Sequence, residues 1–296
     1  MQRIIPAIKT ILLKIKPINK WNQRRKKRLH QAQLLREARI VPGIPFRVHK
    51  YDFMFAGESP EAIEGYNRIG AQACGLIENA LALTKRTFEE VDLLLDFGCG
   101  YGRVTRVLVE KLEPHKISVF DVDPGAAQFC AQEFFVRPLF FKNKWDFNTV
   151  PFGAYDVIWL GSVFTHLSER YTHETFNTIF RILKPNGLLL FTTHGEQTFP
   201  RLQDGFYGTR YQALSARIMQ EYDHEGFSFI PYEDYEIDVL PFVFERARDF
   251  GVTWMSSDFV DQMATSVSHS RLALLKYTPL GWDYHQDVYY YQRGAS

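Results

Sequence analysis

"LLLDFGCGYGRV", residues 93–104, carries the strongest structural signal in the chain. A run of leucines ending in Asp96 predicts a buried strand, and three glycines spaced two apart follow it at Gly98, Gly100 and Gly102. A strand, a glycine-rich turn and a helix form a ligand site in doubly wound folds, because glycine lets a ligand approach the backbone and the first N–H groups of the helix. The stretch therefore predicts a ligand-binding loop in an α/β protein.

The surrounding chain supports this fold class. From residue 91 to about 195, short apolar runs alternate with helical patterns. Such alternation predicts a mostly parallel sheet covered by helices on both faces. A helix is expected before it at 60–86, and another at 256–267 precedes two strands at 271–280 and 287–292. Residues 196–255 are rich in aromatic and polar residues and predict an inserted lid subdomain.

Charge is distributed unevenly along the 296 residues. Of the 35 Lys and Arg residues, ten lie within residues 1–28, which leaves 25 in the rest of the chain against all 34 acidic residues. An acidic body argues against a nucleic-acid partner. Three widely spaced cysteines give neither a zinc motif nor a disulfide framework, which favours a reducing, cytoplasmic location.

The first 45 residues are expected to form a basic amphipathic arm. Isoleucines and leucines recur there at helical spacing between lysines, and "RRKKR" follows at 24–28. One interpretation is peripheral membrane contact through residues 1–28. The other is a helix packed on the body or on a partner, followed by solvated charges. We divide the rest into a helical cap at 46–90 and a catalytic domain at 91–296, with the insertion at about 196–255.

The spacing of the glycines indicates which class of ligand the loop binds. A dinucleotide fingerprint would read GxGxxG, whereas this loop reads GxGxG. Asp96, just before the first glycine, suits a cationic amino-acid group and would repel a pyrophosphate. A ligand with a nucleoside and an amino-acid tail is therefore favoured over a nicotinamide dinucleotide.

Acidic residues also follow the next two strands. Asp121, with Val122 beside it, comes 23 residues after Gly98, where a carboxylate can accept both ribose hydroxyls. Asp123 is the close alternative. Asp146 follows the third strand and could accept a hydrogen bond from an adenine amino group, with Phe147 or Trp145 stacking nearby.

Four segments in order resemble class I S-adenosylmethionine-dependent methyltransferases: residues 93–104, "ISVFDVDP" at 117–124, 145–167 and "RILKPNGLLLFTT" at 181–193. The resemblance implies a seven-stranded, Rossmann-like sheet and S-adenosyl-L-methionine as the cofactor. It implies that the three glycines line the methionine part and that Leu160 and Gly161 lie beside the methyl donor. It also implies that Asp96 faces the amino group, Asp121 the ribose and Asp146 the adenine. "HQDV" at 285–288 is similar to a bacterial subgroup often associated with polysaccharide or glycoconjugate biosynthesis.

Three histidines are candidates for a general base if the acceptor is a hydroxyl, namely His194, His285 and His166 in that order. All three are expected near the carboxyl ends of strands, where open α/β sheets bind ligands. We expect methyl transfer, to oxygen rather than nitrogen, onto a small molecule or a saccharide. The alternatives are a non-catalytic scaffold of the same fold and an NAD-dependent oxidoreductase. The sequence gives no indication of oligomeric state.

Overall fold

The computed structural model describes residues 35–140, 147–233 and 249–295. Its centre is a seven-stranded sheet with the order β10-β11-β7-β6-β3-β4-β5. The strands are β3 (Leu94–Phe97), β4 (Ile117–Phe120), β5 (Arg137–Pro138), β6 (Tyr155–Leu160), β7 (Leu183–Thr193), β10 (Leu272–Trp282) and β11 (Gln286–Arg293). Strands β3 to β7 pair in parallel, and β11 pairs antiparallel with both β7 and β10. The predicted mostly parallel, seven-stranded α/β sheet is confirmed.

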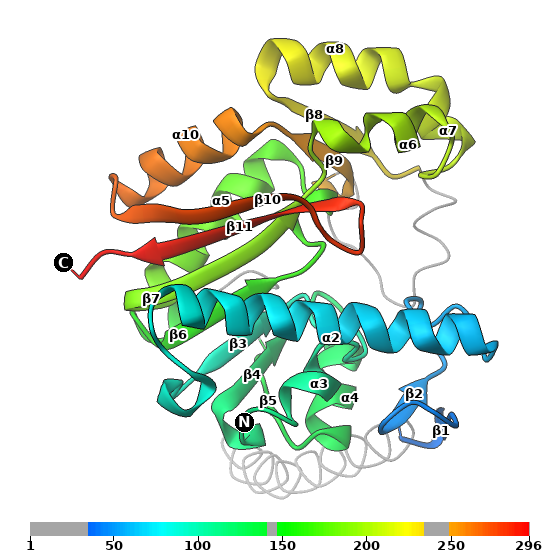
Figure 1. Ribbon diagram of the computed structural model, residues 1–296, viewed down its shortest axis with the longest axis vertical. Coiled ribbons are helices and arrows are strands. Elements are labelled where there is room, and N and C mark those ends of the chain that lie inside the picture. Colours follow the sequence, from blue (N-terminus) through cyan, green and yellow to red (C-terminus); the bar gives the residue numbers. More distant parts are fainter. Residues whose placement is uncertain (1–34, 141–146, 234–248, 296) are drawn as a thin grey trace, which may run out of the picture.

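Helices cover both faces of this sheet (Figure 1). Alternate strand residues point to opposite faces, so Leu94 and Val157 pack with one layer while Leu95 and Ile158 pack with the other. The first layer contains α2 (Pro60–Leu83), α3 (Thr105–Leu108) and α4 (Pro124–Glu133). The second contains α5 (Glu169–Ile182) and α10 (Ser257–Ser268). Because every residue of β3, β4 and β6 is buried, these strands read as mainly apolar runs in the sequence, each interrupted by one polar residue: Asp96, Ser118 and Asp156.

Side-chain caps fix where the long helices begin. The hydroxyls of Ser59, Ser168 and Ser256 accept hydrogen bonds from the first turns of α2, α5 and α10. The expected helices at 60–86 and 256–267 are thus confirmed to within a few residues at their ends. The helix expected after the glycine loop is shorter, since α3 spans only four residues and irregular turns follow it.

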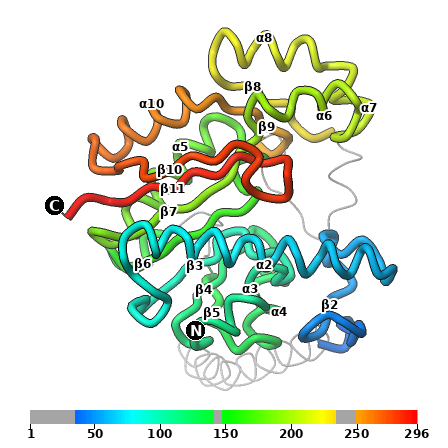
Figure 2. The backbone as a smooth tube through the Cα atoms, in the orientation of Figure 1, coloured from blue at the N-terminus to red at the C-terminus, as the bar shows by residue number. Residues whose placement is uncertain are grey.

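An N-terminal hairpin and α2 make up the region before the sheet. The hairpin pairs β1 (Ala38–Ile40) with β2 (Arg47–His49). Helix α2 then runs alongside the C-terminal hairpin of β10 and β11, although about 200 residues separate them in the chain (Figure 2). The Trp282 indole N–H donates to the Ile69 carbonyl oxygen at 3.1 Å, which fixes this contact.

The expected insertion has its own small apolar cluster, built around Trp254, Leu202 and Ile218. Its elements are α6 (Phe199–Gln203), α7 (Thr209–Ala213), α8 (Ser215–Glu225), β8 (Phe227–Pro231) and β9 (Gly251–Met255). Strands β8 and β9 form a separate antiparallel pair. Short 3-10 turns connect other parts of the chain: η1 (Phe88–Glu90), η2 (Pro114–Lys116), η3 (Phe147–Thr149), η4 (Phe164–His166) and η5 (Glu196–Thr198).

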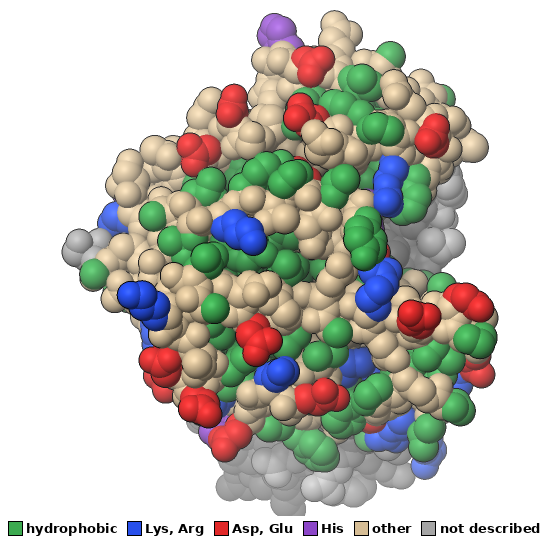
Figure 3. Space-filling view, viewed as in Figure 1, with side chains coloured by type: hydrophobic (Ala, Val, Ile, Leu, Met, Phe, Trp, Pro, Cys, Tyr) green, Lys and Arg blue, Asp and Glu red, His purple; other side chains and the backbone are tan. Residues whose placement is uncertain are grey.

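The described surface is mixed in charge. On the face shown in Figure 3, Lys and Arg side chains are dispersed among acidic and apolar ones and do not form a continuous basic band. None of the described helices has the length and apolar character needed to cross a membrane. Most of the basic arm predicted for residues 1–45 falls in residues 1–34, which lie outside the described residues, so its two interpretations stay predictions.

Candidate active site

A pocket of about 310 Å³ opens at the carboxyl ends of β3, β4 and β6. We call it the glycine-loop pocket, because Gly98 and Gly100 form part of its wall. The turn between β3 and α3 brings these glycines to the sheet edge, where the N–H groups of Gly98 and Cys99 donate to the Phe120 carbonyl oxygen at 2.7 and 3.0 Å. The pocket is therefore placed by backbone hydrogen bonds between two neighbouring strand ends.

The glycines of the loop serve different purposes. Gly100 and Gly102 have φ values of 50° and 86°, which side chains rarely adopt. At Gly102 a Cβ would lie 2.3 Å from a ring carbon of Phe134, so this glycine is required for packing. At Gly100 a Cβ would meet nothing within 4 Å, so the open side of the backbone at this residue faces space that a ligand can enter.

Asp96 lies at the floor of the pocket with 1% of its surface exposed. Its Oδ2 accepts a hydrogen bond from the Thr105 hydroxyl at 2.6 Å. Burial raises the pKa of Asp96 to about 7, although the Thr105 hydrogen bond opposes this shift. A cation bound next to Asp96 would lower that pKa and stabilise the charged form.

Asp121 and Asp123 have different environments. The two carboxylate oxygens of Asp121 each accept one backbone N–H, from Gly100 at 2.8 Å and from Asp123 at 2.9 Å. Each oxygen retains a second lone pair, which a ligand hydroxyl can use. Asp123 also accepts one hydrogen bond on each oxygen, from the Gly125 N–H that begins α4 and from the Tyr101 hydroxyl, both at 2.8 Å, but it is buried whereas Asp121 is half-buried. The geometry favours Asp121 over Asp123 as a ribose ligand.

The other residues expected at the cofactor fall into three groups. Val122 and Gly161 line the pocket. Leu160 and Phe147 are buried in the core, where the Phe147 ring stacks on Phe97 at 5.5 Å between centroids. Asp146 lies outside the described residues, so the adenine contact stays a prediction.

The three candidate histidines occupy different places. His166 lines the pocket, whereas neither His194 nor His285 is among its lining residues. His194 is buried under the insertion, with 3% of its surface exposed. Its Nδ1 lies 3.0 Å from the Thr253 carbonyl oxygen. His285 lies in the β10–β11 turn, at the carboxyl edge of β7 as expected, because β10 runs in the direction of β7.

Residues 95–189 match the model of a methyltransferase-domain family. The match begins in β3, includes the glycine loop and Asp121, and ends in β7. Residues 95–189 therefore form a methyltransferase domain. The family uses S-adenosylmethionine, and the open backbone at Gly100 together with the carboxylates of Asp96 and Asp121 fits that cofactor.

Curated relatives match the same central region. The chain is 31% identical over 123 residues to a malonyl-[acyl-carrier protein] O-methyltransferase of Halalkalibacterium halodurans, covering 40% of this chain and 45% of that protein. It is 32% identical over 115 residues to the N-terminal Xaa-Pro-Lys N-methyltransferase 1 of Mus musculus, covering 37% and 51%. The chain thus spans about half the length of the curated relatives it matches.

A solved structure with a similar arrangement is the N-methyltransferase NodS of Bradyrhizobium japonicum in complex with S-adenosyl-l-homocysteine. It has a TM-score of 0.47 and 14% identity, over 81% of this chain and 94% of that one. The assignment of this chain to the methyltransferase domain family rests on the family match and on the sheet order given above.

The rest of the pocket wall, which we call the acceptor side, includes residues that were not predicted from the sequence. Tyr51, Phe53 and Met54 follow β2, and Trp282 ends β10. Arg103 directly follows the last glycine of the loop. A basic residue beside the glycine loop and a tryptophan before "HQDV" were the available signals. Neither identifies a pocket wall without the three-dimensional packing.

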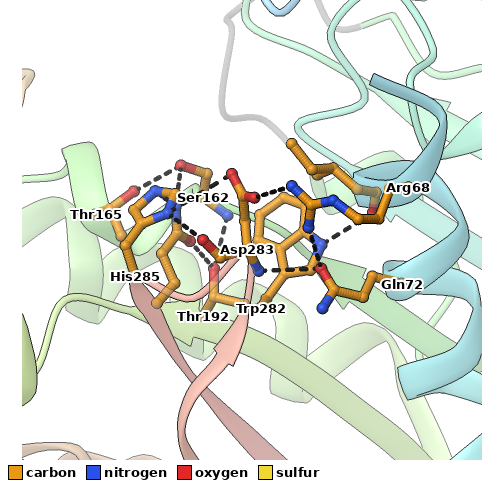
Figure 4. A network of polar contacts seen from close by, with 10 residues as sticks. Arg68, Gln72, Ser162, Thr165, Thr192, Trp282, Asp283 and His285 are labelled. Atoms are coloured by element: carbon orange, nitrogen blue, oxygen red, sulfur yellow. Dashed lines mark hydrogen bonds and ion pairs between the residues drawn. The ribbon is translucent and has the colours of Figure 1, made fainter. Parts of the chain in front are cut away.

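A polar network holds the loop after β6 against the C-terminal hairpin (Figure 4). The Gln286 amide donates to the Ser162 hydroxyl at 3.1 Å and accepts from the Thr192 hydroxyl at 2.5 Å. Ser162, which lines the pocket, has a φ of 58°. Non-glycine residues in this conformation are strained and persist where surrounding contacts fix them. The "HQDV" segment therefore contributes to the shape of the acceptor side.

Proposed function

We propose that this protein transfers the methyl group of S-adenosylmethionine to an oxygen atom of a small-molecule acceptor. The observation that carries the proposal is that one pocket is lined both by Gly100 and Asp121, which are predicted to bind the cofactor, and by His166. S-adenosylmethionine supplies an activated methyl group, so the protein has to bind and align the acceptor and exclude water. A pocket that joins the two sets of residues meets this requirement.

On the cofactor side, three residues would hold the ligand. Asp96 would accept hydrogen bonds from the amino group, and Asp121 would accept them from the ribose hydroxyls. The backbone at Gly100 would pack against the methionine part. The buried Asp96 carboxylate, whose pKa is raised to about 7, supports this assignment because a cationic ligand would compensate for its burial.

On the acceptor side, His166 is our candidate for the general base. Its Nδ1 lies 3.0 Å from the Gly251 carbonyl oxygen and 2.7 Å from the Tyr232 hydroxyl. Because a carbonyl oxygen only accepts, we place the proton of the neutral ring on Nδ1, which leaves Nε2 unprotonated. Burial lowers the pKa of His166, so the ring is neutral at pH 7 and able to take a proton from an acceptor hydroxyl.

The acceptor class is argued from the pocket wall and from the relatives. Rings of Tyr51, Phe53, Trp159 and Trp282 line the pocket, which suits a small organic molecule. The Halalkalibacterium halodurans relative is named as an O-methyltransferase, which supports transfer to oxygen, whereas the Mus musculus relative is named as an N-methyltransferase. The saccharide or glycoconjugate acceptor, the cytoplasmic location and any membrane contact stay predictions from the sequence.

Two measurements test the proposal. Calorimetry should show saturable binding of S-adenosylhomocysteine and no comparable binding of NAD. Methyl transfer from labelled S-adenosylmethionine should then be measured with a panel of hydroxylated small molecules, saccharides and acyl-carrier-protein thioesters. The proposal fails if the protein binds NAD and does not respond to the sulfur-containing ligand.

The role of His166 is tested separately. His166→Gln should lower the rate of methyl transfer to a hydroxyl by about 100-fold or more, because general-base catalysis contributes about 10²–10⁴. Affinity for S-adenosylhomocysteine should stay within about twofold. His115→Gln, at an exposed position away from the pocket, is the matched control and should leave both values unchanged. Equal rates in the two variants would remove His166 from the mechanism.

A further inference from the structure

Arg103 presents a guanidinium group to the glycine-loop pocket without a polar partner. It lines the pocket, yet its side chain makes neither a hydrogen bond nor an ion pair in the part of the chain that the structure describes. A guanidinium carries five N–H donors in a planar fork that matches a carboxylate. The pocket therefore contains an anion-binding group that the fold itself does not use.

Arg106, three residues later, shows what a structural arginine looks like in the same segment. It is 1% exposed, and its Nε and Nη1 donate to the carbonyl oxygens of Gly102 and Pro45 at 3.2 and 2.6 Å. Its guanidinium also packs against the rings of Tyr66 and Phe134. Arg106 thus ties the glycine loop to the N-terminal region, whereas Arg103 has no comparable structural role.

The Arg103 guanidinium is nevertheless held in place. It lies over the Trp282 ring at 5.5 Å from the centroid. That ring is itself fixed by its hydrogen bond to the Ile69 carbonyl oxygen and by an edge contact with Trp159 at 5.4 Å between centroids. Stacking on an aromatic ring orients the guanidinium before a ligand arrives, which reduces the entropy lost on binding.

The Arg103 guanidinium is partly buried, so an anion bound beside it would stabilise its charge. Burial lowers the pKa of Arg103, and the nearby acids Asp52 and Asp283 oppose that shift without forming ion pairs with it. Asp52 is engaged with the Tyr66 hydroxyl at 2.6 Å, and Asp283 with Arg68 at 3.1 Å. A charged side chain in a partly dehydrated wall gains most from a ligand that brings the opposite charge.

Trp282 also relates Arg103 to the expected site of methyl transfer. A ring carbon of Trp282 lies 2.9 Å from the position that a Cβ on Gly161 would occupy. Gly161 directly follows β6, at the strand end where the methyl donor is expected. Arg103 therefore belongs to the part of the pocket near the reacting group, where an acceptor has to be oriented.

We propose that the methyl acceptor carries a carboxylate group and that Arg103 binds this carboxylate as an anchor. The inference rests on the proposed function of this pocket and specifies its substrate class. In this arrangement the methylated oxygen is a separate hydroxyl of the acceptor, and His166 removes its proton. The cofactor also has a carboxylate that could pair with Arg103. Titration with S-adenosylhomocysteine and with methylthioadenosine distinguishes this carboxylate from that of the acceptor.

The test uses the full chain saturated with S-adenosylhomocysteine and short carboxylates as probes. Calorimetric titration should show binding of malonate or succinate, and at least tenfold weaker binding of the neutral malonamide and succinamide. Arg103→Gln should weaken carboxylate binding at least tenfold, and Arg103→Lys should give an intermediate value. Arg217→Gln, on the exposed face of α8, is the matched control and should bind as the original chain does.

Three outcomes would overturn the proposal. The first is that the carboxylates bind no better than the amides, and the second is that Arg103→Gln binds them unchanged. The third is that Arg103→Gln weakens S-adenosylhomocysteine at least tenfold while leaving methylthioadenosine, which lacks the amino-acid carboxylate, unchanged. That result would assign the guanidinium to the cofactor. If the original chain does not bind S-adenosylhomocysteine at all, the proposed function itself fails, which is a separate result.

Discussion

The two sides of the glycine-loop pocket are built in different ways. The cofactor side comes from the strand ends and turns of neighbouring parallel strands, within residues 96–123. The acceptor side gathers Arg103, which follows the glycines of the loop, residues after β2 and β6, and Trp282 at the end of β10, so more than 200 residues separate its members. The cofactor side therefore depends on local backbone geometry, and the acceptor side on long-range packing. This difference predicts that substitutions on the two sides will affect different measurements.

Gly102→Ala should have the largest effect on stability. The added Cβ would lie 2.3 Å from the Phe134 ring and 3.1 Å from the Cys130 sulfur, and φ is 86°. Overpacking and the left-handed conformation together should lower the free energy of unfolding by about 3 kcal/mol. Denaturant unfolding of the ligand-free protein measures this loss.

Gly100→Ala is the matched comparison within the same loop. Its Cβ would meet no neighbour within 4 Å, so only the conformational cost of about 1–2 kcal/mol applies. Its main effect should instead be weaker binding of S-adenosylhomocysteine, because the new methyl group enters the ligand space. Equal loss of stability in the two variants would contradict the distinction between a packing glycine and a ligand glycine.

Asp121→Ala should weaken S-adenosylhomocysteine about 100-fold, which corresponds to about 2.7 kcal/mol. The substitution removes the expected ribose acceptor and leaves the N–H groups of Gly100 and Asp123 without their partner. Calorimetry gives the affinity. Asp223→Ala, an exposed position on α8, serves as the control. Full affinity in the Asp121 variant would remove the ribose assignment.

The sequence was sufficient to predict that Asp96, the glycine loop and Asp121 meet at one sheet edge, because the determinants of this arrangement are contiguous. A buried strand followed by closely spaced glycines specifies a turn whose backbone conformation side chains rarely adopt. Asp96 and Asp121 were predicted from their positions at the ends of β3 and β4. The same local logic identified α2, α10, β10 and β11, and the alternating runs between residues 91 and 195 predicted the parallel strands. The predicted ends of the helices were less accurate, as at α3, because tertiary contacts decide where a helix ends.

The acceptor side could not be found in the same way. Nothing local shows that Trp282 will pack beside Gly161, or that Arg103 will face the pocket while Arg106 turns into the core. The ranking of the three histidines as candidates for the general base depended on which of three strand-end loops reaches the pocket. His166 does so, and His194 is instead covered by Tyr207 and Trp254 of the insertion. These facts depend on how distant segments pack.

Gln286→Leu tests the long-range construction of the acceptor side. The variant keeps the volume of the side chain but leaves Ser162 and Thr192 without their shared partner, which should lower the free energy of unfolding by about 2 kcal/mol. S-adenosylhomocysteine affinity should change by less than threefold. Gln292→Leu removes a longer, exposed hydrogen bond on the same strand and should lose less than about 0.5 kcal/mol. Similar losses for the two glutamines would contradict a structural role for the network.

The pH dependence of cofactor binding tests the electrostatics of the cofactor side. Burial raises the pKa of Asp96 to about 7 and that of Asp121 to about 6, so both carboxyls of the ligand-free protein are mostly protonated at pH 5.5. Under the proposed assignment of the cofactor's amino group to Asp96, binding requires the ionised carboxylate. The affinity for S-adenosylhomocysteine should therefore rise about tenfold or more between pH 5.5 and pH 7.5, as both groups lose their protons.

Stability of the ligand-free protein should change in the opposite direction over the same range. Because the folded pKa of Asp96 lies above its unfolded value of about 3.9, the folded state binds more protons than the unfolded chain between these two values. The contribution of Asp96 to stability is thus fully present below pH 3.9 and decreases as the pH rises to 7. Asp96→Asn should remove the Asp96 part of this decrease, and should leave only the parts of the stability change and of the affinity change that Asp121 produces near pH 6. An affinity profile that is unchanged in Asp96→Asn would show that the amino group of the cofactor is bound elsewhere.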